Sequence, residues 1–238
     1  MNEMEKIIVL DSSTIISLSV NCLLHSLSQL KERTGVNFLI PPWVEDETVK
    51  TAVNSIRFRL EGIRIINEIG RNTIQVMGNR IVRNDAINIL NLANNMFYAW
   101  NSPLRIIQKG EAEVLALCKF VGGSYIGCDE KTMRLIIENP ENMRRILESK
   151  LHTEVIVNRK NLARFREIAN GINVLRSADI VAIAFDMGVF DDYLSSCKDY
   201  LETSRSDFVK GFLWALRYSG CSISESEIND YIKYLVGR

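Results

Sequence analysis

The chain has little histidine and no excess of either charge, and both scarcities exclude classes of function. With only His25 and His152 among 238 residues, the sequence argues against a histidine-rich zinc site. The basic and acidic residues number 29 each, so no global charge drives the chain onto nucleic acid or membrane. Its five cysteines are widely spaced and form no CxxC pair, which is typical of reduced thiols in a cytoplasmic protein.

Several sequence signals are also missing. No apolar run approaches the roughly 20 residues of a membrane span, and the first residues show no signal-peptide pattern, so we expect no membrane partner and a cytoplasmic location. There is no GxxxxGKS, GxxxxGKT or GxGxxG motif, so nucleoside triphosphates and dinucleotides lack support as ligands. No Ser–His–Asp or Cys–His constellation is evident.

What is present is a repeated order of a short apolar run, an acidic residue and a helix. Ile7–Leu10 has the β-branched composition of a buried parallel strand, and Asp11 follows it with three hydroxyl residues that suit a helix start. Helical spacing then extends over 15–30. A second run, Asn37–Ile40, leads through two prolines to a helix whose first turn contains Glu47.

The stretch Gly110–Arg134 repeats this order with acids at both ends. Glu111 begins an apolar helix, two glycines end it, and a short β-prone run leads to Asp129. Glu113 lies two positions after Glu111, on the far side of the helix, so we expect a structural role for it. A further strand is expected at Ile172–Leu175, before another apolar helix.

This order predicts a parallel α/β sheet in which acids from several elements meet. The carboxyl ends of parallel strands and the starts of the following helices share one edge, where such sheets bind ligands. The residues expected there are Asp11, Glu47, Glu111 and Asp129. Four unpaired carboxylates repel one another, and a hard cation such as Mg²⁺ or Mn²⁺ relieves that repulsion. Two such ions about 4 Å apart would suit phosphodiester hydrolysis.

Simpler roles for the same residues stay open. Asp11 is also a suitable helix N-cap, and an acid at the position of Glu47 also complements a helix dipole. From Lys50 to Arg83 seven basic residues face only two acids. That segment is either a solvated helix face or a basic wall for phosphate backbones.

The four acidic segments resemble the PIN-domain family of metal-dependent ribonucleases, in the form of an archaeal or bacterial subgroup. The matching segments are IIVLDSSTII, IPPWVEDETV, GEAEVLALC and YIGCDEKTMR. The resemblance implies a three-layer α/β/α fold, RNA as substrate, and Mg²⁺ or Mn²⁺ held by the four acids named above. It also implies that Ser13 or Thr14 steadies Asp11, that Glu130 or Asp179 is an outer acid, and that Lys131 and Arg134 contact phosphate. A salt bridge of these two bases to Glu130 or Glu138 stays open as the alternative.

The chain is longer than a typical PIN toxin, which predicts additions to the core. We expect a core over 1–190, including a helix from Lys131 to about Glu138, with helical insertions at about 50–109 and 138–171. The second insertion contains a possible strand at Glu154–Val157. A helical C-terminal extension is expected over 191–238, where Ser224 and Glu227 fit a capping box. These additions leave a homodimer or an antitoxin-like partner open. They also keep open the alternative of a catalytically inactive PIN-like module that binds RNA or protein. A phosphatase is a third alternative, since Asp11–Thr14 loosely echoes a DxDxT loop, but Ser13 replaces its second aspartate.

Overall fold

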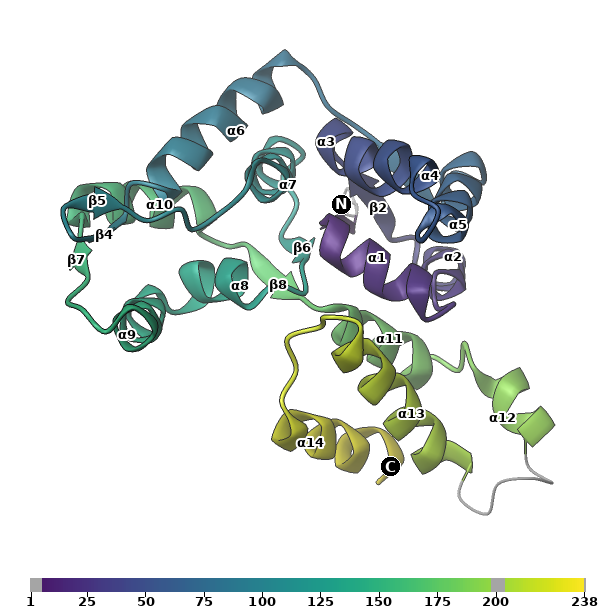
Figure 1. The fold of residues 1–238 in the computed structure, drawn as a ribbon. Coiled ribbons are helices and arrows are strands. Elements are labelled where there is room, and N and C mark those ends of the chain that lie inside the picture. Colours follow the sequence, from purple (N-terminus) through teal and green to yellow (C-terminus); the bar gives the residue numbers. More distant parts are fainter. Residues whose placement is uncertain (1–5, 198–203, 238) are drawn as a thin grey trace, which may run out of the picture.

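A computed structural model describes residues 6–197 and 204–237 of the chain. It is an α/β structure around a five-stranded, all-parallel sheet with the strand order β3-β2-β1-β6-β8 (Figure 1). The strands are β1 (Ile7–Leu10), β2 (Asn37–Ile40), β3 (Ile74–Val76), β6 (Tyr125–Gly127) and β8 (Asn173–Leu175). The predicted strands at β1, β2, β6 and β8 are confirmed, because apolar β-branched runs of this kind are buried on both faces of a parallel sheet.

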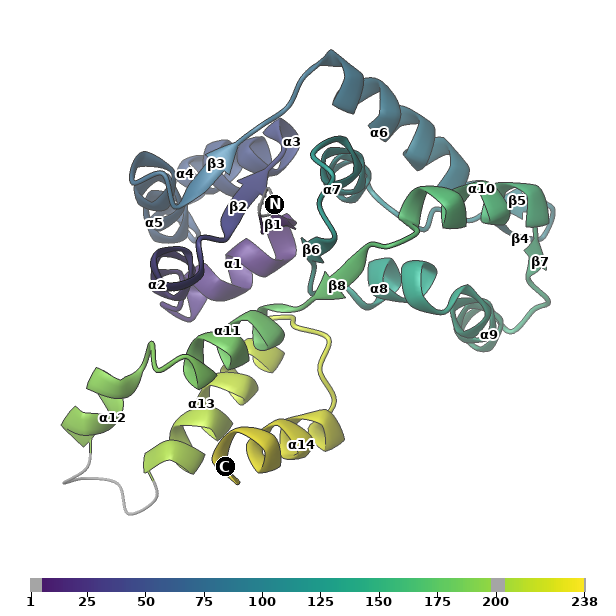
Figure 2. The same cartoon turned by 180° about the vertical axis from the view of Figure 1, so that it is seen from behind.

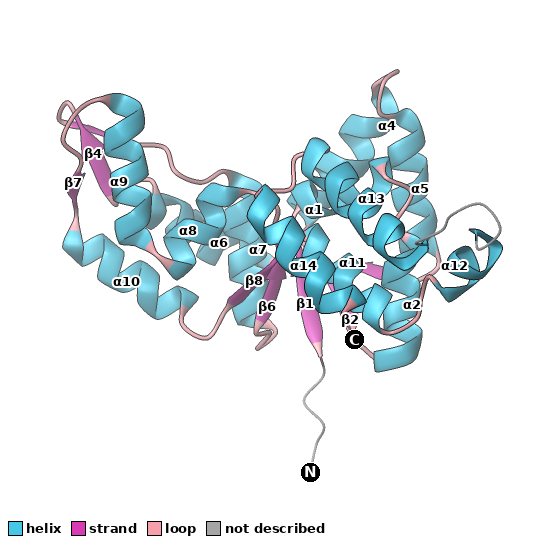
Figure 3. Cartoon of the chain, turned by 90° about the horizontal axis from the view of Figure 1, so that it is seen from below, coloured by secondary structure: helices cyan, strands magenta, loops and turns pink. Residues whose placement is uncertain are grey.

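Helices surround the sheet, as Figure 2 shows from behind and Figure 3 from below. Those of the first half are α1 (Ser12–Val20), α2 (His25–Thr34), α3 (Pro42–Glu45), the π-helical turn η1 (Asp46–Thr51), α4 (Ala52–Asn54), α5 (Arg59–Gly70) and α6 (Arg80–Ala93). Those of the second half are α7 (Lys109–Phe120), α8 (Lys131–Glu138), α9 (Pro140–Leu151), α10 (Arg159–Ala169), α11 (Ser177–Asp186), α12 (Asp191–Cys197), α13 (Ser204–Tyr218) and α14 (Glu225–Val236). Within the described residues, none of them is long and apolar enough to cross a bilayer.

Two features of the first half differ from the predicted pattern. The helical spacing over 15–30 is divided between α1 and α2, because Cys22 adopts a left-handed conformation with φ of 58° between them. The segment 50–109, expected to be a helical insertion, contributes β3 to the edge of the main sheet beside β2. Gln75 interrupts the apolar run of this strand, so the sequence pattern did not reveal it.

The two segments expected to be separate insertions pair with each other. β4 (Phe97–Ala99) lies between β5 (Ser102–Pro103) and β7 (Ile156–Val157) in a small antiparallel sheet. The strand expected near β7 is thereby confirmed. Helix α10 packs on α6, and Figure 1 shows these elements together on one side of the main sheet. They form one subassembly.

Helix α7 is the central element of the core. Every residue from Gly110 to Cys118 is buried, because α7 packs against β1 and β6 and is covered by α6. A helix that is buried all round shows little amphipathicity, which matches its nearly continuous apolar sequence. The acids at its start are therefore held in a well-packed region.

The C-terminal helices pack onto the core rather than extending away from it. Helices α13 and α14 both contact α11, as the yellow-green segments of Figure 1 show. Ser224 caps α14, and Glu227 completes the capping box predicted there. This contact brings the chain's last described helix near the carboxyl ends of β6 and β8.

Candidate functional site

The register of the sheet brings the ends of three strands to the same level. Leu10 pairs with Gly127, and Gly127 pairs with Leu175, so Asp11, Cys128 and Arg176 follow at one edge. A Cβ on Gly127 would lie 2.6 Å from Leu10 Cδ2, so a larger residue here would have to displace the buried Leu10 side chain. This strand pairing brings the residues that follow β1, β6 and β8 to one edge of the sheet.

Asp11 is buried at the N-terminus of α1, where it caps the helix and is held by Ser13. Its Oδ2 accepts hydrogen bonds from Ser13 N at 3.2 Å and from Ser13 Oγ at 2.6 Å. The steadying hydrogen bond expected from Ser13 is thus confirmed, and Asp11 is the N-cap of the helix. Burial raises the pKa of Asp11 against the effect of these bonds, and the charge of Glu47 raises it further.

Glu111 is the most unusual acid of the site. It is 5% exposed, and its Oε2 accepts a hydrogen bond from Gln108 N at 2.7 Å in the capping box of α7. Its Oε1 is buried and has no hydrogen-bond partner. Burial raises the pKa of Glu111 to about 8, and the charges of Asp11, Glu130 and Glu47 add to the effect. A buried carboxylate oxygen without a donor is costly, so this atom marks a place where a cation or a donor is missing.

Glu47 lies in η1, a π-helical turn that continues α3 into α4. Such turns are rare and frequent at functional sites, because the extra residue per turn redirects side chains. Glu47 is exposed, but a Cβ on Gly110 would lie only 3.6 Å from its Oε2, so its carboxylate rests against the start of α7. The charge of Glu47 raises the pKa of both Asp11 and Glu111, which places it in the same group.

The structure directs Asp129 away from this group. Its Oδ1 accepts a hydrogen bond from Ser177 N at 2.6 Å, and its Oδ2 accepts one from Ser177 Oγ at 2.7 Å. Asp129 therefore holds the start of α11. The neighbouring Glu130 faces the other acids instead: burial raises its pKa, and the charges of Asp11 and Glu47 raise it further. A metal-ligand role for Asp129 stays a prediction, and we call the acids that raise one another's pKa, namely Asp11, Glu47, Glu111 and Glu130, the acidic cluster.

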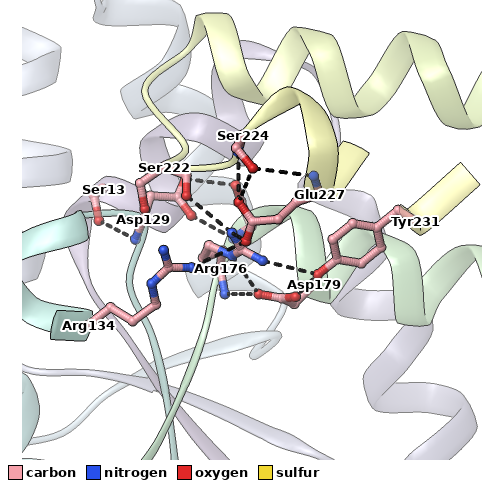
Figure 4. A network of polar contacts seen from close by, with 10 residues as sticks. Ser13, Asp129, Arg134, Arg176, Asp179, Ser222, Ser224, Glu227 and Tyr231 are labelled. Atoms are coloured by element: carbon pink, nitrogen blue, oxygen red, sulfur yellow. Dashed lines mark hydrogen bonds and ion pairs between the residues drawn. The ribbon is translucent and has the colours of Figure 1, made fainter. Parts of the chain in front are cut away.

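A second group of polar residues joins the C-terminal helices to the same edge (Figure 4). We call it the arginine network, and its centre is Arg176, which is 7% exposed. Arg176 Nε lies 3.1 Å from Asp179 Oδ2, and Arg176 Nη1 lies 2.8 Å from Glu227 Oε1. Its Nη2 donates to Tyr231 Oη at 3.3 Å, and Tyr231 Oη donates to Asp179. Asp179, considered as an outer acid of the site, is therefore a member of this network.

The arginine network also reaches Asp129. Ser222 N, just before α14, donates to the main-chain oxygen of Asp129 at 3.1 Å, and Ser222 O accepts from Arg176 Nη1. On the other side, Asp129 N donates to Ser13 Oγ at 3.1 Å. Asp129 thus connects the C-terminal helices, through Ser13, to Asp11.

The two basic residues expected to contact phosphate, both in α8, differ in their surroundings. Lys131 is exposed at the start of α8. Arg134 Nη1 lies 3.9 Å from Glu227 Oε1, so its nearest acid belongs to α14 rather than to α8. Phosphate contact by Lys131, Arg134 or Ser13 stays a prediction. Glu113 accepts a hydrogen bond from Trp43 N at 2.9 Å, in keeping with its expected structural role.

The donor set of the acidic cluster suits a hard divalent cation. All of its oxygens are carboxylate oxygens, and its acids raise one another's pKa. Among residues 6–197 and 204–237, however, no group of three or more histidine, cysteine or acidic side chains is placed to hold a metal ion. Mg²⁺ commonly takes one or two carboxylates and completes its shell with water and substrate phosphate, so Asp11 and Glu111 would be the principal ligands.

Sequence reasoning missed two features of this edge. Glu130 was given only an outer role, although the adjacent acids in the CDEK segment signalled an ambiguity of one residue. The second feature is a cavity beside the cluster, formed by α3, α6 and α7 and lined in part by Trp43, Arg83 and Lys109. No local sequence pattern relates these three residues, because they come from separate helices.

Comparisons with known proteins found no relative. No protein-family model matches the chain, and neither the curated proteins nor the solved structures include a significant match.

Proposed function

We propose that the chain is a PIN-like, Mg²⁺- or Mn²⁺-dependent endoribonuclease that hydrolyses RNA phosphodiesters at the acidic cluster. The observation that carries the proposal is the buried, unpartnered Oε1 of Glu111, with three other carboxylates around it at the carboxyl edge of a parallel sheet. The five-stranded parallel sheet is compatible with the three-layer PIN arrangement.

In this proposal the residues of the chain divide the work. Asp11 and Glu111 would hold the divalent cation, which supplies charge neutralisation and activation of a water when it is bound. Glu47 and Glu130 would orient its water ligands from the more open side of the cluster. Ser13 restrains the carboxylate of Asp11 through its 2.6 Å hydrogen bond, and the α7 capping box restrains Glu111.

Calorimetric titration with Mn²⁺, followed by an RNA cleavage assay, tests the proposal. The wild-type chain should bind Mn²⁺ and cleave single-stranded RNA, and Glu111→Gln should lose both properties. Glu138→Gln removes an exposed carboxylate at the end of α8 and is the matched control, expected to behave as wild type. Cleavage that persists in EDTA or in Glu111→Gln would contradict the mechanism.

A catalytically inactive PIN-like module that binds RNA or protein is the second candidate. The engagement of Asp129 by Ser177 favours it, since it removes one acid from the predicted ligand set. Wild-type protein that binds RNA but takes up no Mn²⁺ would support this candidate over the nuclease.

A further inference from the structure

A cavity of about 390 Å³ lies beside the acidic cluster, between α3, α6 and α7. A second cavity, of about 500 Å³, adjoins it and shares Pro42, Arg83 and Glu113 as walls. Both volumes lie within the usual range of small-molecule sites, roughly 300–1,000 Å³. The cavities continue along α6 toward its N-terminus, where Arg80 also lines the wall.

The lining of the first cavity divides into an apolar part and a basic part. Ala86, Ile87 and Leu90 of α6 supply an aliphatic wall, and Arg83 and Lys109 supply cations. Together with Arg80, these cations face two acids that are already engaged. Asp46 pairs with Lys50, and Glu113 accepts from Trp43 N.

Trp43 is the aromatic element of the cavity and is held in place by its main chain. Its indole ring is 43% exposed, and Lys109 Nζ lies 4.9 Å from the ring centroid. The hydrogen bond from its backbone N to Glu113 and the preceding Pro42 restrain the backbone of this residue. A partly exposed indole on a restrained segment, with a cation over the ring, is a suitable platform for stacking a base.

The cavity is adjacent to the cluster through Gly110. A Cβ at this position would lie 3.2 Å from Trp43 Cδ1 and 3.6 Å from Glu47 Oε2, so the indole and the carboxylate flank the same glycine. A substituent there would press against both groups. The cavity therefore adjoins the acidic cluster on the side of Glu47.

We propose that this cavity is a nucleotide subsite, in which Trp43 stacks a base of single-stranded RNA while Arg83, Lys109 and Arg80 bind the flanking phosphates. The assignment rests on the proposed function for the identity of the substrate, but it concerns binding alone. A base must leave its partner to enter the cavity, so the subsite selects single strands over duplexes. Of the seven basic residues from Lys50 to Arg83, the subsite would use Arg80 and Arg83, which line these cavities.

The test is a binding measurement in EDTA, where no metal-dependent cleavage interferes. The probe is a short fluorescein-labelled single-stranded RNA of mixed sequence, followed by anisotropy. Trp43→Ala should weaken binding by about tenfold, as the loss of one stacked base predicts. Trp100→Ala removes another exposed indole, which lines neither cavity, and should leave the affinity unchanged.

A pair of substitutions on α6 provides an independent readout if Trp43→Ala fails to fold. Ile87 is 52% exposed and lines the cavity, whereas Ile81 is 58% exposed on the same helix and lines neither cavity. Ile87→Glu should weaken binding and Ile87→Lys should strengthen it, each by about fivefold at low salt. Ile81→Glu should have a clearly smaller effect than Ile87→Glu.

The outcomes separate this inference from the nuclease proposal. Loss of affinity in Trp43→Ala and Ile87→Glu, without loss in the controls, supports the subsite whether or not RNA is cleaved. Equal affinity of wild type and both variants, equal effects of the two glutamates on α6, or equal binding of duplex RNA would each overturn it. Failure of wild type to bind the single-stranded probe would overturn it as well.

Discussion

Two groups of acids occupy the same edge of the sheet, but their surroundings differ. In the arginine network Asp179 and Glu227 have a cation and hydrogen-bond donors. Burial acts to raise the pKa of Glu227, but the hydrogen bonds from Ser224 and Arg176 outweigh it and lower this pKa to about 2. In the acidic cluster no cation of the described part of the chain is paired with Glu111, and its pKa is raised to about 8. Paired acids stabilise the fold, whereas unpaired buried acids weaken it and are expected where a ligand binds.

The largest effect should come from removing the centre of the arginine network. Arg176→Met leaves the partly exposed Asp179 and Glu227 without their cation, and we expect a loss of about 3 kcal/mol of unfolding free energy. Thermal denaturation of the metal-free protein measures it. Arg145→Met, on the exposed side of α9, is the control and should change stability by less than about 0.5 kcal/mol. Similar losses of unfolding free energy in both variants would show that the arginine network does not stabilise the fold more than an exposed arginine does.

The adjacent acids Asp129 and Glu130 should respond in opposite ways. Asp129→Ala removes two short bonds from Ser177 and should lower stability by about 2–3 kcal/mol. Glu130→Ala should have a small effect on stability and should weaken Mn²⁺ binding. Chemical denaturation and calorimetric titration of both variants check this pattern. If Glu130→Ala protein binds Mn²⁺ as well as wild type does, Asp129 rather than Glu130 is the fourth acid of the site.

Removing the charge of Glu111 should stabilise the metal-free protein at alkaline pH. Its folded pKa of about 8 lies above the ordinary value of 4.5, so the folded state holds this proton more tightly than the unfolded state. Its contribution to stability is therefore lost as pH rises from about 4.5 to 8. Glu111→Gln should be more stable than wild type at pH 8.5 by about 2 kcal/mol, with no difference near pH 4.

The same titration affects the metal. A cation needs the ionised carboxylate, so Mn²⁺ affinity should rise with pH up to about 8 in wild type. Stability curves at several pH values, measured with and without Mn²⁺, test both statements. A flat pH dependence of wild-type stability over this range would contradict the raised pKa.

The smallest effect should come from Ser13. Ser13→Ala removes the hydroxyl that donates to Asp11 at 2.6 Å and accepts from Asp129 N, and should lower stability by about 1 kcal/mol. It should also weaken Mn²⁺ binding, because Asp11 is less restrained. Ser12→Ala, one residue earlier on α1, is the control for loss of a hydroxyl. Equal effects in the two variants would leave Ser13 with no special role.

Much of the fold followed from local patterns. The strands β1, β2, β6 and β8, helix α8 and the capping box of α14 were predicted, because each is encoded by apolar runs or capping residues close together in the chain. The missed elements depend on distant partners. β3 is only three residues long, and the small sheet joins segments that are more than fifty residues apart.

The sequence alone determined that Asp11 and Glu111 lie at one edge, because the direction of a parallel strand decides where its successor helix begins. It also determined the separation of Glu111 from Glu113 by helical geometry. Only the tertiary structure showed how the surroundings of Asp129 and Glu130 differ. Ser177, 48 residues away, and Ser222, in the C-terminal segment, bind Asp129 and turn its carboxylate toward α11. Contacts made by distant residues have no signature in the local sequence, so this difference between adjacent acids is decided by packing.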